Sequence, residues 1–215
     1  MKEKLRSILR TVWSWRRWPY LLQLRRSVKN RRFLIIASDC NGGLLLHDLG
    51  MEFATPTINM AFHHFEKLCT HLDEYLALPP VPMDAPERRY PMFTLGETII
   101  EGTHYKSREE FLAAWERRLR RFNARRAEGY EILLMADEAA LSENGGLEEF
   151  LAAPYRKICF TNDPNKTGRE FVYIPDRRKN DYRDSWRAVG LRGVRIFERE
   201  MDIPAFLDDT GEKEG

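Results

Sequence analysis

The sequence predicts an α/β fold: a mainly parallel sheet in a three-layer α/β/α arrangement, preceded by a basic amphipathic helical arm. Three observations lead to this class. Short apolar runs rich in β-branched residues recur along the chain, segments with apolar residues at helical spacing separate them, and the first run ends in a loop with two glycines. Strands that alternate with helices of roughly 10–20 residues form parallel crossover units, with helices on both faces of the sheet.

The first apolar run marks where the sheet begins. Five apolar residues at 33–37 predict a buried strand, and the small and polar residues at 38–43 predict a tight loop. The apolar run at 44–49 then forms a short helix, which Gly50 ends in the left-handed conformation that glycine tolerates. In an α/β domain, a ligand usually binds where a strand ends in such a loop.

The other elements follow from the same patterns. Five prolines within residues 78–91 predict an extended loop. Ser107, with Glu110 three residues later, predicts a capping box at the start of a helix. Helices are expected at 65–76, 107–128 and 142–151. Strands are expected at 57–62, 93–100, 131–137, 157–161, 171–174 and 194–197.

Composition and cysteine usage are those of an ordinary globular protein with reduced cysteines. The chain has 215 residues, 43% of them hydrophobic, which suits one domain at 33–205 followed by a polar tail at 206–215. Its three cysteines are widely spaced and none lies in a CxxC pair, which argues against a disulfide framework or a structural zinc site. No apolar run reaches the roughly 18 residues of a membrane span, and no signal-peptide pattern is present. A cytoplasmic location is expected.

Residues 1–32 carry the opposite charge to the rest of the chain. They contain eleven Lys or Arg and one acid, a net charge of +10, so the remaining residues carry −8. Apolar residues at helical spacing and several Trp make this arm suited to an anionic membrane surface. The same pattern fits a helix packed on the domain with its arginines in solvent. Nucleic acid is not an expected partner, because the acidic body would repel its phosphates.

Three blocks of residues carry a family resemblance. The first consists of Ser38-x-Cys40-x-Gly42-Gly43, Leu49-Gly50 and Thr55-Pro56-Thr57-Ile58-Asn59. The second consists of Tyr90-Pro91, His104-Tyr105-x-Ser107, Trp115-x-x-Arg118 and Asn123, and the third of Lys157-Ile158-Cys159-Phe160-Thr161. In this order they resemble a bacterial family of exopolysaccharide biosynthesis proteins, catalogued as a domain of unknown function, number nineteen-nineteen. The resemblance covers about residues 33–161, and the arm lies outside it.

The resemblance implies an α/β fold and a role near surface-polysaccharide assembly, without an established reaction. We therefore expect a glycosyl or related group transferase that acts at the cytoplasmic membrane face. The alternative is a non-catalytic partner that binds a sugar or nucleotide and tethers a polysaccharide synthase complex. In either case the expected ligand is a nucleotide-sugar or a sugar, and no cofactor is expected.

The loop at 38–43 is the expected substrate-binding site. Glycines let a backbone approach a ligand closely, and the free amides at a helix start attract phosphate. Any tight strand-to-helix turn uses glycines in the same way, so a purely structural role stays open. Arg118, on an arginine-rich helix, can grip a phosphate or face solvent. The expected substrate-binding residues are Ser38, Asn41, Gly42, Gly43, Asn59 and Arg118.

Cys40, Asp39 and His104 are the expected catalytic residues. A helix amino terminus favours the thiolate of Cys40, and a cysteine nucleophile needs a histidine partner, for which His47 and His104 are the candidates. Alternatively, Cys40 is a small buried core residue. His104 lies just before a helix, where it can act as a general base or bind a sugar hydroxyl, or instead cap the helix or pair with a carboxylate.

No metal site is expected from the sequence. His63 and His64 are adjacent, so on a helix they point about 100° apart, and no HxH spacing supplies a further ligand. The DxD pattern of metal-dependent sugar transferases is absent from the sequence. Asp137 ends a strand, where α/β enzymes often place an acid for ribose or metal.

Overall fold

The computed structural model describes residues 2–175, 189 and 193–209, with side chains from residue 15 onward. The strands are β1 Phe33–Ala37, β2 Ala61–His63, β3 Val81–Met83, β4 Met92–Leu95, β5 Thr98–Glu101, β6 Glu131–Asp137, β7 Arg156–Thr161 and β8 Phe171–Tyr173. The helices are α1 Lys2–Ser27, α2 Asn41–Leu49, α3 Phe65–Thr70, α4 Leu72–Leu76, α5 Arg108–Ala127, η1 Glu138–Ala140 (3₁₀), α6 Gly146–Ala152, α7 Ile196–Glu200 and α8 Ile203–Asp208.

A parallel sheet of four strands, in the order β1-β6-β7-β8, forms the centre of the fold. The continuous apolar runs that predicted β1 and β6 are buried along almost their whole length, as expected for a sheet covered on both faces. In the register of this pair, Ala37 lies opposite Met135. Ser38, which follows β1, and Asp137, the last residue of β6, therefore lie at the same carboxyl edge.

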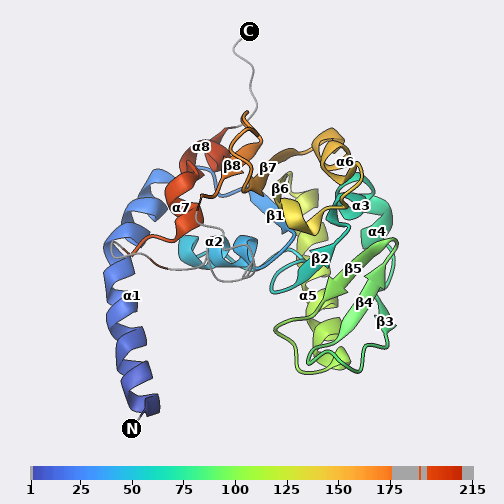
Figure 1. The fold of residues 1–215 in the computed structure, drawn as a ribbon, viewed down its shortest axis with the longest axis horizontal. Helices are drawn as coiled ribbons and strands as arrows, with labels where there is room; N and C mark the ends of the chain where they lie inside the picture. Colours follow the sequence, from blue (N-terminus) through green and yellow to red (C-terminus); the bar gives the residue numbers. More distant parts are fainter. Residues whose placement is uncertain (1, 176–188, 190–192, 210–215) are drawn as a thin grey trace.

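The side chains of β1 alternate between two apolar clusters. Ile35 belongs to a cluster with residues of α1, α2, α7 and α8, whereas Ile36 belongs to a cluster with residues of α3, α4, α5 and α6. Figure 1 shows the parallel sheet between these two groups of helices. The predicted α/β class with a parallel sheet is confirmed, whereas the detailed three-layer α/β/α arrangement stays a prediction.

A second, antiparallel sheet in the order β2-β5-β4-β3 was not predicted. The expected strand at 57–62 is shortened to β2, because Asn59 adopts a left-handed φ of 63° that interrupts an extended chain. The expected strand at 93–100 is a hairpin, β4 and β5, which turns at Gly96 with a φ of 58°. Pro82 lies in β3, the edge strand, where its missing amide donor is tolerated.

Four other predicted elements differ from the structure. The helix expected at 142–151 begins only at Gly146, as α6, after Gly145 with a left-handed φ of 77°. Helix α2 begins at Asn41, so both glycines of the predicted loop lie in its first turn. The single helix expected at 65–76 is interrupted at His71 and forms α3 and α4. The strand expected at 194–197 is wrong: α7 begins at Ile196, where the Glu198 carboxylate accepts a hydrogen bond from the Arg195 amide and caps the helix. Residues 210–215 of the predicted tail lie outside the described residues.

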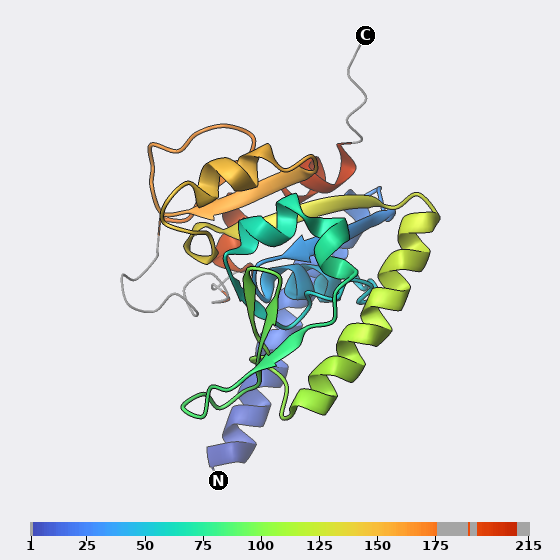
Figure 2. The same cartoon turned by 90° about the vertical axis from the view of Figure 1, so that its right-hand side faces the viewer.

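Helix α1 belongs to the domain at its carboxyl-terminal end and extends away from it at its amino-terminal end (Figures 1 and 2). Leu24 and Val28 are 4% and 3% exposed and belong to the apolar cluster that covers one face of the sheet. The second half of the predicted arm therefore contributes to the core. Among the described helices, none is long and apolar enough to cross a membrane.

Candidate functional site

Cys40 and His104 meet at the carboxyl edge of the parallel sheet. The Sγ atom of Cys40 lies 3.2 Å from Nε2 of His104, a contact between residues 64 positions apart in the sequence. Cys40 is 7% exposed and directly precedes α2, whereas His104 is exposed in the turn between β5 and α5. A thiol at a helix amino terminus in contact with an imidazole is the arrangement by which proteins activate a cysteine nucleophile.

Two buried carboxyl side chains lie at the same edge. Asp39 is 4% exposed and lies two residues after β1, whereas Asp137 is 1% exposed and is the last residue of β6. Ser38 joins the two strands: its amide donates to the Met135 carbonyl at 2.9 Å, and its hydroxyl accepts from the Asp137 amide at 2.8 Å. The Asp39 carboxylate accepts from the Asn41 amide at 2.8 Å. The carboxyl edge thus combines a thiol with two acids and a histidine.

The second sheet is attached to this edge by backbone contacts. The Phe62 amide donates to the Ser38 carbonyl at 2.9 Å, and the Ala37 amide donates to the Thr57 hydroxyl at 3.2 Å. These bonds fasten the segment before β2 to the end of β1. Since β2 pairs with β5, they also fix the turn after β5 that carries His104.

The buried side chain of Arg118 contacts Tyr105, the residue that follows His104. It is 7% exposed, and its guanidinium donates to the Ile58 carbonyl at 2.8 Å and to the Tyr105 hydroxyl. Burial raises the pKa of Tyr105, although the Arg118 cation opposes this shift. All of these contacts are internal, so they assign Arg118 a positioning role. Its predicted contact with substrate stays a prediction.

The two glycines of the motif are explained by close packing. A Cβ atom on Gly42 would lie 2.7 Å from the Ala37 Cβ, and one on Gly43 would lie 3.2 Å from the Ile58 Cγ2 and 3.4 Å from the Asn59 Oδ1. Helix α2 therefore packs directly on β1 and on the segment before β2. This packing, with Asp39 accepting from the Asn41 amide, favours a structural role for the glycines over a phosphate cradle.

Asn41 is buried within this packing and has an unused polar atom. Its side chain is 1% exposed, and its Oδ1 has no hydrogen-bond partner among the described residues. A buried acceptor without a partner is costly, so such atoms usually have a structural or functional reason. The predicted substrate-binding residues Ser38, Asn41, Gly42, Gly43 and Asn59 thus lie close together around the start of α2, and their contact with a substrate stays a prediction.

A second polar cluster next to His104 was missed by sequence reasoning. Glu101, at the end of β5, is 2% exposed and contacts His63 Nε2 at 3.1 Å and the Tyr90 hydroxyl at 2.7 Å. The hydrogen bond from His63 outweighs burial and lowers the pKa of Glu101. The sequence did offer one indication of this cluster, because Tyr90 belongs to the same block of family-like residues as His104. The pairing itself needed the hairpin β4–β5, which the sequence did not reveal.

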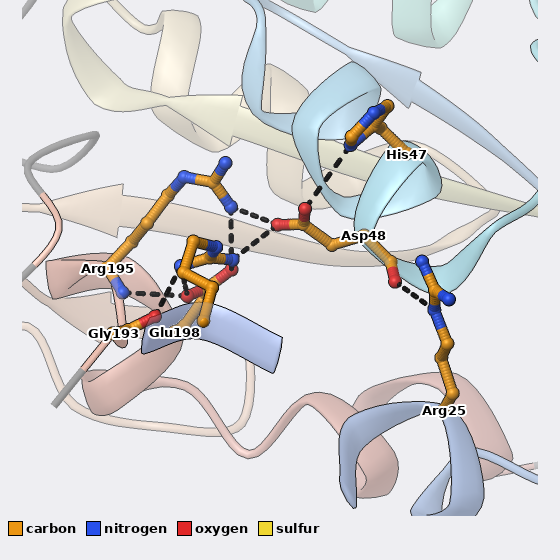
Figure 3. A network of polar contacts seen from close by, with 7 residues as sticks. Arg25, His47, Asp48, Gly193, Arg195 and Glu198 are labelled. Atoms are coloured by element: carbon orange, nitrogen blue, oxygen red, sulfur yellow. Dashed lines mark hydrogen bonds and ion pairs between the residues drawn. The ribbon is translucent and has the colours of Figure 1, made fainter. Parts of the chain in front are cut away.

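The other candidate ligands and thiols lie elsewhere. His47, the second candidate partner of Cys40, is largely exposed, with its Nδ1 3.3 Å from the Asp48 carboxylate (Figure 3). The thiols of Cys69 and Cys159 are fully buried, and burial raises the pKa of Cys69 well above its usual value. No group of three or more His, Cys, Asp or Glu side chains that could hold a metal ion occurs in the part of the chain that the structure describes.

Comparison with known proteins relates this site to one family. An uncharacterized protein of Haemophilus influenzae is 25% identical over 180 residues, which cover 82% of this chain and 84% of that protein. A family profile described as a domain of unknown function (DUF1919) matches residues 16–207. The match extends beyond the expected range of 33–161 and includes the second half of α1, in agreement with its packing on the domain. The chain therefore belongs to the DUF1919 family.

Proposed function

We propose that the chain is a group-transfer enzyme of bacterial exopolysaccharide or capsule assembly, a glycosyl or related group transferase with Cys40 and His104 as its reacting pair. The observation that carries this proposal is the 3.2 Å contact between the Cys40 sulfur and His104 Nε2. The resemblance of the surrounding residue blocks to exopolysaccharide biosynthesis proteins supplies the substrate class. The donor is a nucleotide-sugar or another activated sugar derivative.

The reaction proceeds in two displacements at the transferred group, with the Cys40 sulfur as nucleophile in the first and as leaving group in the second. In the first, His104 accepts the thiol proton, sulfur bonds to the transferred group, and the bond between that group and its donor breaks. The leaving group takes the proton from the imidazolium. In the second, an acceptor hydroxyl loses its proton to His104 and attacks the transferred group, which releases the Cys40 sulfur as a thiolate. His104 then returns its proton to this sulfur.

The buried acids have supporting roles in this scheme. Asp39 fixes the first turn of α2 through the Asn41 amide, and so fixes the position of the Cys40 sulfur between them. Asp137 is held at the same edge by Ser38. Carboxylates at this position can accept hydrogen bonds from sugar hydroxyls or favour the imidazolium form of a nearby histidine.

Helix α1 suits attachment to the membrane on which polysaccharides are assembled. Trp15 and Trp18 are 76% and 55% exposed on α1, on either side of the buried Arg17. Exposed Trp beside Lys and Arg is typical of segments that bind the interface of an anionic bilayer. We therefore place the enzyme in the cytoplasm, peripherally at the inner face of the membrane.

These same tryptophans favour a second candidate function, that of a non-catalytic partner. In that case the chain binds a sugar or nucleotide and tethers a synthase complex through α1. The contact between Cys40 and His104 would then only stabilise the fold. Donor turnover by the purified chain distinguishes an enzyme from a partner that is merely stabilised by the ligand.

The test combines turnover with trapping of the covalent species. The purified protein is incubated with nucleotide sugars and oligosaccharide acceptors, and donor consumption is followed together with the intact mass of the protein. We expect turnover and a mass increase on Cys40, both lost in Cys40→Ala and His104→Asn. Cys159→Ala removes a thiol from the core and serves as the control, with turnover retained.

Polymer production in cells provides the decisive result. A strain that carries Cys40→Ala or His104→Asn in place of the native gene should lose its polymer, whereas Cys159→Ala should not. Normal polymer with both site variants, at normal protein levels, rules out catalysis by this pair. Thermal stabilisation by a nucleotide sugar without any turnover would favour the tethering function instead.

A further inference from the structure

A cavity of about 640 Å³ lies between the β3–β4 connection and the start of α5. This volume is within the range of small-molecule sites. Its walls come from residues 83–86, 88–92 and 106–108. None of these residues was expected to bind a ligand from the sequence, where residues 78–91 were predicted only as an extended loop.

The cavity has a strongly positive lining. Four cations and one acid line it: Arg88, Arg89, Lys106, Arg108 and Asp84. The single acid is already paired, since Arg108 donates to the Asp84 carboxylate at 2.7 Å and to the Met83 carbonyl at 2.9 Å. Three cations therefore remain to face an anionic ligand.

Two of these cations are available for a ligand. Arg89 and Lys106 have exposed side chains, and neither has an ion-pair partner within 4 Å among the residues that the structure describes. The Glu110 carboxylate accepts a hydrogen bond from the backbone amide of Lys106 at 2.9 Å. Arg88 is partly engaged, with its guanidinium 3.9 Å from the Glu101 carboxylate.

The cavity is joined to the turn that carries His104. Lys106 is two residues after His104, and Tyr90 of the opposite wall donates to Glu101, three residues before it, at 2.7 Å. The Gly102 amide also donates to the Pro91 carbonyl at 2.9 Å. The cavity wall thus includes Lys106 of the turn that carries His104, and its opposite wall is hydrogen-bonded to Glu101 and Gly102 before that turn.

We propose that this cavity binds the phosphate or diphosphate of the substrate, with Arg89 and Lys106 as the main contacts and Arg88 as a third. Arginine forks and lysine ammonium groups are the usual phosphate ligands of proteins. The inference rests on the proposed function for its role, which is to hold the charged end of an activated sugar donor while the reacting carbon approaches Cys40. Both nucleotide-sugars and lipid-linked sugars carry such a group.

Binding of defined anions by the full-length protein tests this assignment. Inorganic pyrophosphate and uridine diphosphate are titrated by calorimetry, and vesicles with a polyisoprenyl diphosphate are tested by flotation. We expect one of these probes to bind, with affinity reduced at least tenfold in Arg89→Ala and Lys106→Ala. A preference for uridine diphosphate assigns a nucleotide donor, and a preference for the vesicles assigns a lipid-linked one.

A matched control and a charge-preserving variant separate this site from general electrostatics. Arg120→Ala removes one positive charge from the exposed face of α5 outside the cavity and should change affinity less than twofold. Lys106→Arg keeps the charge and should retain most of the affinity. Equal losses in Arg120→Ala and Lys106→Ala, or no binding of any probe, would overturn the proposal.

The two proposals fail in different experiments. His104→Asn should leave pyrophosphate and uridine diphosphate binding intact, because the histidine does not line the cavity. If the native protein binds these anions but shows no turnover, the phosphate site is retained and the catalytic assignment is rejected. If the native protein shows turnover, and Arg89→Ala and Lys106→Ala change neither KM nor kcat, the catalytic assignment is retained and the phosphate site is rejected.

Discussion

The guanidinium of Arg17 in α1 lies 2.6 Å from the carboxylate of Asp48 in α2. Arg17 also donates to both oxygens of Glu198 in α7 and to the Gly193 carbonyl, and Arg195 joins the same two acids (Figure 3). Arg17 is 7% exposed although its neighbours on the helix face solvent. The first helix is therefore fastened to two other helices by a buried ion network.

The first prediction concerns the stability that this network provides. Arg17→Met should lower the free energy of unfolding by about 3 kcal/mol, because it removes one of the two arginines that neutralise the buried carboxylates of Asp48 and Glu198. For a chain of this size the melting temperature should fall by roughly 6–12 °C. Arg26→Ala, an exposed arginine on the same helix, is the control and should shift melting by less than about 2 °C.

The second prediction is the pH dependence of this network. Burial raises the pKa of Asp48, but the Arg195 and Arg17 cations outweigh burial and hold that pKa below its usual value. A lowered folded-state pKa contributes stability that is fully present above the unfolded value of about 4 and is lost as pH falls through the folded value. The difference in stability between the native chain and Asp48→Asn should be constant from pH 5 to 7 and shrink below about pH 4. Urea unfolding at each pH measures it, and a difference that grows toward acid would contradict this account.

The third prediction tests the packing of the glycine motif. Gly42→Ala should destabilise the protein by about 1–2 kcal/mol, although alanine favours a helix, because its Cβ would lie 2.7 Å from the Ala37 Cβ. Removing the opposing atom with Ala37→Gly should relieve the clash. The double variant should therefore lose about 1 kcal/mol less stability than the two single variants lose together. Purely additive losses would show that the motif is not a packing device.

Much of the parallel sheet could be predicted because its strands are marked by local runs of apolar residues. The apolar run at 33–37 and the run at 131–137 agree with β1 and β6. Ser107 caps α5 through the Glu110 amide as expected, but the Glu110 carboxylate accepts from the Lys106 amide and does not complete the predicted capping box. The antiparallel sheet could not be predicted in the same way. Its hairpin depends on a turn at Gly96, in the middle of the segment 93–100 that was expected to form one strand.

The site was predictable only in part, because it is assembled from distant segments. The sequence singled out Cys40 and named His104 as one of two partners, and the structure brings these two together rather than Cys40 and His47. The roles of Glu101 and of the cations around the cavity depend on how the second sheet folds back on the first. No spacing rule in the sequence reports such a contact.

The fourth prediction concerns the tryptophans of α1. Because Trp15 and Trp18 are exposed beside basic residues, the protein should float with vesicles that contain anionic lipid and not with neutral ones. Trp15→Ala with Trp18→Ala should reduce the bound fraction at least threefold without a change in melting temperature, since neither side chain is in the core. High salt should weaken binding as well. Equal flotation of the native and double-variant proteins would exclude these residues as the membrane contact.

The fifth prediction concerns the reactivity of the Cys40 thiol in the folded protein. His104 Nε2 lies 3.2 Å from the sulfur and can accept its proton, so this thiol should react faster than an unassisted one. Cys69 and Cys159 are fully buried and should not react without unfolding. Iodoacetamide should therefore modify one thiol per native chain, and peptide mapping should place it on Cys40.

His104→Gln keeps a polar side chain of similar length but cannot take the proton as imidazole does. The alkylation rate of Cys40 at pH 7 should fall at least tenfold in this variant. His47→Gln, which changes the other candidate histidine, should leave the rate unchanged, because His47 contacts Asp48 instead. If His104→Gln and the native protein react at the same rate, the contact does not activate the thiol, and Cys40 is a core residue that lies near a histidine.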